Sequence, residues 1–245
     1  LPGEDRYKKV TLDIHGGGFV YGLKEINKCC NMTVASLTNM PVVSINYNLC
    51  PTVSIVTMLN EIMSAIKHIV ATHGTREITI MGDSAGGYLA LATWALLSDE
   101  KVREDFKCDV KVDVDVSGLV LICPAARDDS DYIGGIENTY FADDADNLLP
   151  SYGRNLDEIM EKVSKEVPPT VLITSDKDFL HDVTVDLFEK MTAKGIDSRL
   201  FDGVTKENGN ELTHVYVVGH PDWEESKEPL EFKAITAPIA FRTNT

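Results

Sequence analysis

The 245-residue chain is predicted to fold as an α/β protein with a mostly parallel central sheet and helices on both of its faces. Short, nearly continuous apolar runs alternate with segments of helical periodicity, as in folds built from strand–helix–strand units. The apolar runs lack a strict in–out alternation, which is typical of strands buried on both faces. Glycine-rich and polar residues follow several of the predicted strands, where active sites of such sheets lie.

Six short apolar segments are expected to form the strands. Prolines bound two of them: Pro124 ends one run, and Pro168 and Pro169 open another, as expected of a residue that cannot donate to a sheet ladder. The predicted strands are residues 10–14, 42–46, 78–81, 119–123, 170–174 and 198–202.

Helical periodicity separates these strands. Ile55, Leu59, Ile62, Ile66 and Ile69 recur at intervals of three and four residues, which puts them on one face of an amphipathic helix. Further helices are predicted at residues 85–97, 156–163, 182–193 and 224–241.

A single domain is expected over residues 1–245, because a chain of this length can bury one substantial core. One segment, at about 125–167, interrupts the alternation of strands and helices and is rich in aspartate. Connections this long are uncommon unless they form a lid or a binding loop. We therefore predict a cap or lid insertion at about 125–167.

The charge balance bounds the partners of the protein. Lys and Arg number 23 against 39 Asp and Glu, a formal net charge of −16. Nucleic acid and anionic membranes attract basic surfaces, so neither is an expected partner. No apolar run approaches the roughly 18 residues that span a bilayer, and no secretory signal is evident.

Five cysteines are present, and none of them forms a C-x-x-C pair. An odd number without such spacing favours free thiols in a reducing compartment, so a cytoplasmic location is expected. The cysteines are Cys29, Cys30, Cys50, Cys108 and Cys123.

The sequence Gly82-Asp83-Ser84-Ala85-Gly86-Gly87 lies between a predicted strand and a predicted helix. This is a G-x-S-x-G pattern in a strand–turn–helix context, where a serine occupies a sharp turn with its hydroxyl exposed. An isolated serine is inert because its hydroxyl is a weak nucleophile without a base. The context here predicts Ser84 as a nucleophile.

A second glycine motif, His15-Gly16-Gly17-Gly18-Phe19, directly follows the first predicted strand. Consecutive glycines let a ligand approach backbone amides closely. A phosphate-binding loop would continue with Lys-Ser or Lys-Thr, which this one does not. We expect the amides of Gly17, Gly18 and Ala85 to form an oxyanion hole, with Gly16 shaping the turn.

An acid that orients a base is expected after a later strand. Asp176, Asp178 and Asp182 all follow the predicted strand 170–174. Asp178 lies where a loop can turn its carboxylate toward the site, Asp182 resembles a helix N-cap, and Asp176 can bond locally within the turn. Position alone leaves this choice open.

The base is expected after the acid, in the chain order Ser…Asp…His. His181, His214 and His220 satisfy that order. His181 is too close to the acid in sequence to reach round easily, and His220 precedes Pro221 and suits a turn. His214 is therefore preferred, while His15 is expected to anchor the glycine loop.

Together these motifs resemble the hormone-sensitive-lipase family of α/β-hydrolase esterases. The H-G-G-G motif at 15–18 and the elbow at 82–87 match that family as they stand, and Asn46 to Pro51 resembles its Tyr-Arg-Leu-Ala-Pro stretch. Residues 175–182 resemble the acid loop of the family, and 214–216 resemble its His-x-Phe.

The resemblance implies an α/β-hydrolase fold and selects Ser84, Asp178 and His214 as the triad, with Gly16, Gly17, Gly18 and Ala85 at the oxyanion hole. It also implies hydrolysis of short-chain, acetyl-like carboxylic esters, with a small-molecule ester as the substrate and no cofactor or metal. Two alternatives stay open: a non-catalytic small-molecule receptor on the same fold, and a deacetylase of acetylated sugars.

The cap is where the sequence departs from that family. Only 14 residues precede His15, whereas family members carry a longer segment that contributes cap helices. We expect a small or reduced cap, contributed by 125–167 or by a partner subunit in a homo-oligomer. Residues 52–55, after Pro51, also differ from the family, which leaves the shape of the substrate pocket open.

Overall fold

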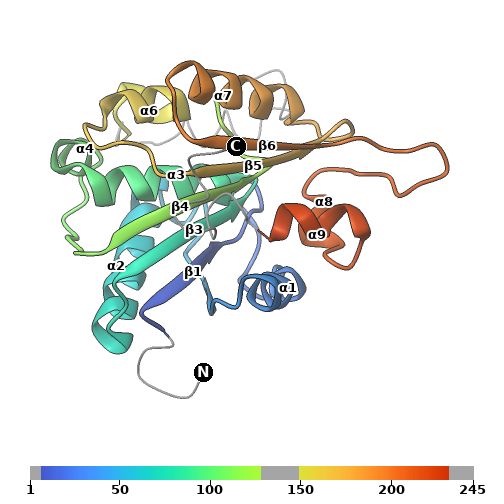
Figure 1. The fold of residues 1–245 in the computed structure, drawn as a ribbon. Helices are drawn as coiled ribbons and strands as arrows, with labels where there is room; N and C mark the ends of the chain where they lie inside the picture. The colour runs from blue at the N-terminus through green and yellow to red at the C-terminus, as the bar shows by residue number, and fades with distance from the viewer. Residues whose placement is uncertain (1–6, 128–148, 232–245) are drawn as a thin grey trace.

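The computed structural model describes residues 7–127 and 149–231. Their six strands form one sheet in the order β2-β1-β3-β4-β5-β6, and every neighbouring pair is parallel (Figure 1). The predicted fold class is thereby confirmed. The strands are β1 (Lys9–Ile14), β2 (Val42–Ile45), β3 (Glu77–Asp83), β4 (Asp115–Ile122), β5 (Thr170–Ser175) and β6 (Ser198–Gly203).

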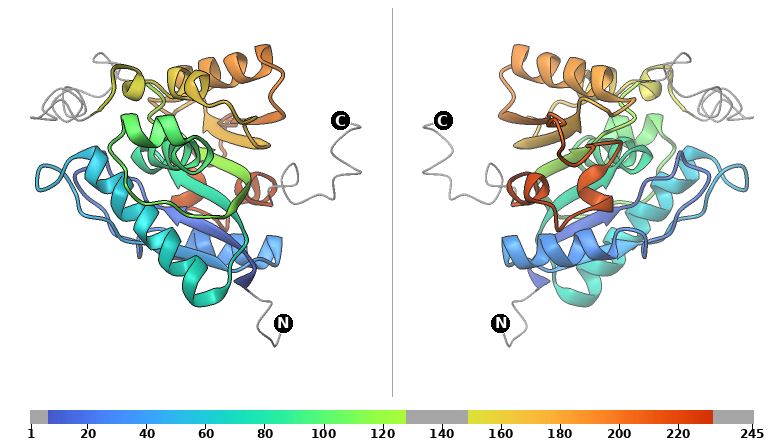
Figure 2. Two further views of the ribbon diagram at one scale, coloured as in Figure 1. Left: turned by 90° about the vertical axis from the view of Figure 1, so that its left-hand side faces the viewer. Right: turned by 90° about the vertical axis from the view of Figure 1, so that its right-hand side faces the viewer.

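Helices cover both faces of this sheet, as Figure 2 shows from two sides. One face carries α2 (Ile55–His73), α3 (Ala85–Ser98), α4 (Glu100–Asp105), α6 (Leu156–Lys162) and α7 (His181–Ala193), with a short 3₁₀ turn, η2 (Ser151–Arg154). The other face carries α1 (Lys28–Thr38), α8 (Tyr216–Gly219) and α9 (Glu224–Leu230).

Successive strand residues pack into different layers of the core. Leu119 and Leu121 of β4 join the cluster beneath α2 and α3, whereas Val120 and Ile122 join the cluster beneath α1 and α8. Side chains of a strand point alternately to its two faces. A strand with both faces covered must therefore be apolar throughout, which explains the continuous apolar run in the sequence.

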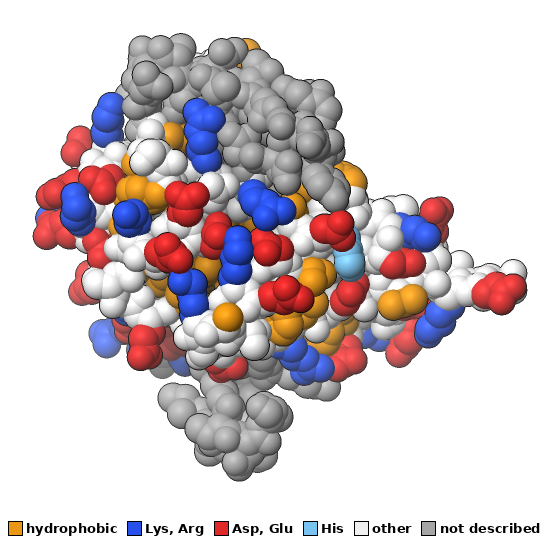
Figure 3. All heavy atoms as spheres, turned by 90° about the horizontal axis from the view of Figure 1, so that it is seen from above, with side chains coloured by type: hydrophobic (Ala, Val, Ile, Leu, Met, Phe, Trp, Pro, Cys, Tyr) orange, Lys and Arg blue, Asp and Glu red, His pale blue; other side chains and the backbone are white. Residues whose placement is uncertain are grey.

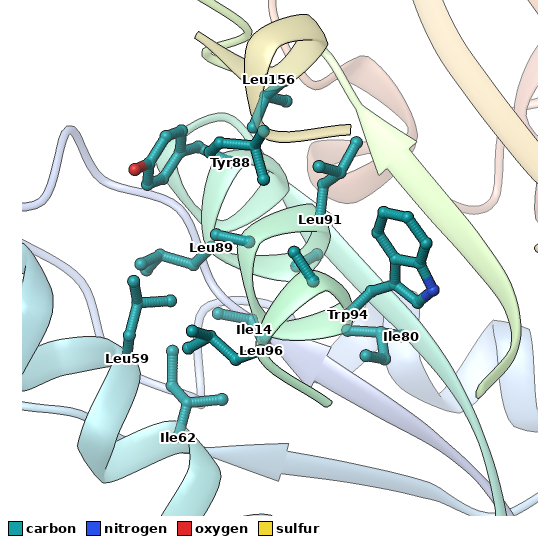
Figure 4. Close-up of a cluster of buried hydrophobic side chains, with 14 of the residues drawn as sticks. Ile14, Leu59, Ile62, Ile80, Tyr88, Leu89, Leu91, Trp94, Leu96 and Leu156 are labelled. Atoms are coloured by element: carbon teal, nitrogen blue, oxygen red, sulfur yellow. The ribbon is translucent and has the colours of Figure 1, made fainter. Parts of the chain in front are cut away.

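The central helix α3 is buried on all sides. Every residue from 85 to 96 is buried, and a helix that is apolar all round belongs in the interior. Tyr88, Leu91 and Trp94 point into the cluster of Figure 4, which also holds Ile14 and Ile80 from the strands beneath. The helix that follows Ser84 is thus held in the interior of the protein.

The strand predictions were accurate, and the helix predictions were less complete. Helix α1 was missed because only Cys30, Asn31 and Val34 are buried along its 11 residues, too few to give a clear apolar period. The short α4, α8 and η2 were also missed. The final helix is shorter than predicted over the part described, since α9 ends at Leu230, and residues 232–241 lie outside the described residues.

The predicted lid falls only partly within the described residues, because 128–148 lie outside them. Its later part packs against the main body. Leu156 and Ile159 of α6 are fully buried, and the Tyr88 hydroxyl donates a hydrogen bond to the Gly153 carbonyl at 2.5 Å. Within 149–167 the chain therefore contributes to the same core as α3.

The surface over α6 and α7 carries both signs of charge, intermingled (Figure 3). Lys190 lies 2.7 Å from Asp157 and 3.0 Å from Asp186, and Lys194 lies 2.9 Å from Glu161. None of the described helices is both long and apolar enough to cross a membrane.

Candidate active site

Ser84 occupies a sharp turn between the end of β3 and the start of α3. Its φ of 54° and ψ of −121° are unusual for a residue with a side chain. Four backbone hydrogen bonds hold it there: its N–H donates to the Ile122 carbonyl at 2.8 Å, and its carbonyl accepts from Gly87 at 2.9 Å, Ala125 at 3.0 Å and Tyr88 at 3.3 Å. Such strain persists where the surroundings over-determine it, and it concentrates at functional sites.

Gly86 allows α3 to start this close to the sheet. A Cβ at this position would lie 2.0 Å from the Ile14 carbonyl oxygen of β1. Any side chain would therefore push the first turn of α3 away from the strand that precedes the glycine loop. The elbow motif thus sets the distance between Ser84 and that loop.

The glycine loop lies directly beside Ser84. A Cβ built on Gly16 would stand 3.1 Å from the Ser84 Cβ. The Gly16 amide is engaged, because it donates to the Asp83 carboxylate at 3.0 Å. It therefore suits the turn-shaping role better than that of an oxyanion donor.

Gly17 and Gly18 have φ values of 120° and 58°, and a Cβ on Gly17 would come within 2.0 Å of the Tyr21 carbonyl oxygen. Within the described parts of the chain, their amides donate to no other group. Ala85 is the first residue of α3, so its N–H has no intrahelical acceptor. The three amides predicted to bind an oxyanion are all available to do so.

A buried polar network supports the loop from beneath. The Asn27 side-chain amide donates to Asp83 at 2.8 Å and to Asp13 at 3.0 Å. Asp13 also accepts from Asn31 and Ser44, each at 2.6 Å. The glycine loop is thereby connected to β1, β2 and α1 through two buried carboxylates. Asn27, Asn31 and Asp13 carried no motif that sequence reasoning could have recognised.

Asp83 should make stability depend on pH. Burial, reinforced by the charge of Asp13, raises the pKa of Asp83 from 3.8 to about 6. The folded state thus binds the proton more tightly, and the free energy of unfolding should fall as pH rises from 3.8 to about 6. Asp83→Asn removes this titration and should flatten the pH dependence in that window, as measured by urea unfolding at several pH values.

The exposed carboxylate of Asp109 provides the matched control. Asp109→Asn should keep the wild-type slope of unfolding free energy against pH. An Asp83→Asn protein with the wild-type slope would contradict the assignment of the buried charge.

His15 anchors the glycine loop from its side. The ring is buried and stacks on Tyr47 with centroids 4.4 Å apart, and its Nδ1 donates to the Gly16 carbonyl at 2.8 Å. The Tyr47 hydroxyl in turn donates to the His15 carbonyl at 2.6 Å. Burial lowers the pKa of His15, which favours the neutral ring. These contacts agree with the structural role expected for His15.

Asp178 lies in the turn between β5 and α7, and its carboxylate is fully enclosed. Oδ1 accepts from the Leu180 N–H at 3.0 Å and Oδ2 accepts from the Thr174 hydroxyl at 2.8 Å. Burial acts to raise the pKa of Asp178, but hydrogen bonds and the charge of His214 outweigh it, so the pKa lies below 3.8. The group is therefore a carboxylate at neutral pH.

His214 contacts Asp178 directly: its Nδ1 lies 2.6 Å from Oδ1. Because the carboxylate only accepts, Nδ1 carries the proton and Nε2 is left as the acceptor. The ring packs against Phe179 with centroids 4.2 Å apart, and the His214 side chain is 22% exposed. The imidazole is thus oriented on one side and accessible on the other.

The loop bearing His214 is tied to the acid loop. Thr213 forms an isolated parallel bridge with Lys177, and the Ser175 hydroxyl donates to the Leu212 carbonyl at 2.5 Å. Residues 36 positions apart in the chain are therefore held together by the backbone on either side of them.

The competing acids and bases are engaged elsewhere. Asp176 accepts from the N–H and hydroxyl of Thr205 at 3.0 and 2.8 Å. His181 bonds through its two ring nitrogens to Asp182 and Asp202, and His220 stacks on Trp223. Asp182 lies in the first turn of α7 rather than at the N-cap, which is Leu180, so that expectation was wrong. Of the three histidines considered, the structure brings His214 to Asp178.

The register between β3 and β4 brings Ser84 to the edge of the sheet where Asp178 and His214 lie. Asp83 pairs with Ile122, so the residues that follow, Ser84 and Cys123, leave neighbouring strands side by side. Cys123 in turn lies beside Asp178 and His214. The Ser84 hydroxyl makes no hydrogen bond with the described residues, and the residue is 8% exposed. Such bonds often tighten only when substrate is bound.

One further residue was missed from the sequence. Cys123 Sγ, an Asp178 oxygen and a His214 nitrogen all lie within 4.8 Å of one another. Among the described residues, this is the one cluster of three or more potential metal-ligating side chains. Cysteine, histidine and aspartate are zinc ligands, but here a hydrogen bond already joins Asp178 and His214. In the sequence, the apolar run around Cys123 did not indicate that its thiol lies beside Asp178 and His214.

The fold and these contacts define a class: a parallel α/β protein with a serine elbow, a histidine paired with a buried carboxylate, and free loop amides at the carboxyl edge of its sheet. Residues 11–206 match the family described as having the alpha/beta hydrolase fold, and the chain belongs to that family.

Curated relatives include esterases. The carboxylesterase/phospholipase LipF of Mycobacterium tuberculosis is 26% identical over 205 residues, which cover 77% of this chain and 52% of that protein. The versiconal hemiacetal acetate esterase of Aspergillus parasiticus is 31% identical over 116 residues, which cover 47% of this chain and 33% of that enzyme. The match to LipF thus spans about half of its length.

Solved structures share the fold. Esterase B of Lactobacillus rhamnosis superposes with a TM-score of 0.79 at 23% identity, covering 93% of this chain and 76% of that one. A hyperthermophilic esterase from the archaeon Pyrobaculum calidifontis gives a TM-score of 0.68 at 23% identity, covering 95% of this chain and 77% of that one.

Proposed function

We propose that the protein hydrolyses short-chain carboxylic esters through a Ser84–His214–Asp178 triad. The observation that carries this proposal is the 2.6 Å contact between His214 Nδ1 and the buried Asp178 carboxylate, at the sheet edge where Ser84 forms its elbow. It leaves Nε2 free to act as a base. The esterase relatives support the same reaction class.

In the first half-reaction, His214 Nε2 accepts the Ser84 proton while the hydroxyl oxygen attacks the ester carbonyl carbon. The amides of Gly17, Gly18 and Ala85 stabilise the oxyanion, and Asp178 stabilises the imidazolium. His214 then gives its proton to the departing alkoxide, which leaves as an alcohol. The acyl group stays on the Ser84 oxygen.

In the second half-reaction, water takes the place of the alcohol. His214 removes a proton from the water as it attacks the acyl-enzyme, and the oxyanion forms again at the same amides. Collapse releases the carboxylic acid and returns the proton to Ser84. Each half-reaction needs an imidazole oriented with Nε2 toward the reacting groups, and the hydrogen bond from Nδ1 to the buried carboxylate provides that orientation.

Exposed apolar side chains beside the site support an apolar ester as the substrate. Tyr21 and Leu23, just beyond the glycine loop, are 67% and 48% exposed, and Phe179 on the His214 ring is 46% exposed. Apolar lining with a few convergent polar groups is usual for small-molecule sites. The named acetate esterase among the relatives favours a small acyl group.

The test is a panel of p-nitrophenyl esters from acetate to decanoate. We expect kcat/KM to be highest for acetate to butyrate and to fall sharply for longer chains, a fall that would indicate an acyl pocket closed to extra methylenes. A fluorophosphonate probe should also label Ser84 stoichiometrically, as located by peptide mass spectrometry.

The alternative is a receptor that binds a small molecule without turning it over. It predicts no ester hydrolysis and no labelling of Ser84, and that pair of results would reject the proposed function. Labelling with equal activity on all chain lengths would keep the enzyme class and reject the short-chain preference.

A further inference from the structure

We propose that Cys123 is a positioning residue for the acid and base of this site: its thiol donates a hydrogen bond to Asp178, accepts one from the backbone beside His214, and so fixes one relative to the other. This inference rests on the proposed function, because it gives Cys123 a part in the same reaction.

On the acid side, the thiol completes the set of donors around Asp178. The carboxylate accepts from His214 and Leu180 through Oδ1 and from Thr174 through Oδ2. Cys123 Sγ lies within 4.8 Å of an Asp178 oxygen, where its S–H is the proposed fourth donor. A carboxylate offers about four acceptor positions, so four donors satisfy it. Thr174 and Leu180 flank Asp178 in the chain, whereas Cys123 comes from the end of the neighbouring strand β4.

On the base side, the Val215 N–H donates to Cys123 Sγ at 3.3 Å. Val215 directly follows His214 and has a φ of 51°, in the left-handed region where a β-branched residue is strained. The bond to sulfur therefore fixes the direction in which the chain leaves His214. One sulfur atom thus contacts both the acid and the segment bearing the base.

Cys123 is itself held firmly. Its side chain is fully buried, its φ is 46°, and its N–H donates to the Ile173 carbonyl at 2.7 Å. The preceding residue, Ile122, accepts the Ser84 N–H. Burial and the adjacent Asp178 charge raise the pKa of the thiol well above its usual value, so it stays a protonated donor and does not compete with Ser84.

Removing the thiol should change both geometry and charge. Among the described residues, Asp178 and Cys123 lie close to the His214 side chain, Asp83 interacts with its charge, and Phe179 packs against the ring. Without the S–H donor, the Asp178 charge is less neutralised and holds the imidazolium more strongly. The acid limb of the kcat/KM profile should therefore move to higher pH.

The experiment compares Cys123→Ala and Cys123→Ser with the wild type, using the full chain and p-nitrophenyl butyrate. Cys123→Ala should lower kcat about tenfold, the scale of one lost hydrogen bond to a charged group. KM should change little, because the thiol is buried and touches no substrate. Cys123→Ser keeps a donor and an acceptor, so its kcat should lie within about threefold of the wild-type value. The acid limb of its kcat/KM profile should lie at or below the pH of the wild-type limb.

Cys108→Ala is the matched control. Cys108 is also a buried thiol that donates to a backbone carbonyl, that of Val110, but it follows α4 on the opposite side of the sheet from α8 (Figure 1). This variant should keep the wild-type kcat and pH profile.

Two outcomes would overturn the inference. One is a Cys123→Ala protein with unchanged kcat and pH profile; the other is a lower kcat with an unmoved acid limb, which a packing role alone predicts. If Cys123→Ala fails to fold by circular dichroism, a Cys123→Ser acid limb above that of the wild type overturns it. An inactive, unlabelled wild type would instead reject the proposed function.

Discussion

Replacing Ser84 by alanine is expected to lower kcat by about 10⁶, leaving only the acceleration that the oxyanion donors and substrate binding provide. The fold should persist, because Ser84 is held in its turn by four backbone hydrogen bonds that alanine can also make. The measurement is p-nitrophenyl acetate hydrolysis, with thermal unfolding followed in parallel.

Ser117→Ala serves as the control for this prediction. Ser117 lies in β4, where its hydroxyl bonds to the Ile78 carbonyl, remote from the carboxyl edge of the sheet. The Ser117→Ala protein should hydrolyse the ester at close to the wild-type rate. Substantial activity in a folded Ser84→Ala protein would show that another group performs the attack.

The second large effect is expected at Asp178. Asp178→Ala should lower kcat on the order of 10⁴, because the imidazolium loses the carboxylate 2.6 Å from its Nδ1. That variant also leaves the donors of Leu180 and Thr174 without their acceptor, so it should unfold at a lower temperature. Asp178→Asn retains an acceptor oxygen and separates the loss of charge from the loss of stability.

Asp176→Asn is the matched control, since Asp176 lies two residues away and bonds to Thr205 instead. Its kcat should stay at the wild-type level, while that of Asp178→Asn falls. The opposite ranking of these two variants would assign the acid to Asp176.

Much of the fold was predictable because burial leaves a direct signature in the sequence. Strands covered on both faces must be apolar throughout, and α2 must carry a periodic apolar face. Helix α1 escaped prediction because it buries only Cys30, Asn31 and Val34 along one side. The short α8 escaped because its four residues offer no period to detect.

The candidate site divides in the same way. Ser84 and the three loop glycines were predictable, since a strained turn and close backbone approach demand particular residues in consecutive positions. Asp178 was not separable from Asp176 and Asp182 by position alone, and family resemblance made that choice. The structure adds the 2.6 Å contact with His214 that the other two carboxylates lack.

The sequence by itself determined a parallel α/β fold, a serine elbow and a glycine loop, because each depends on local backbone geometry and on burial. Only the tertiary structure shows the contact between Asp178 and His214, the place of Cys123 beside them, and the Asp13–Asn27–Asp83 network beneath the glycine loop. Those contacts join residues tens of positions apart through strand register and loop packing. No local pattern records them, because each residue involved satisfies its own local structure equally well without the others.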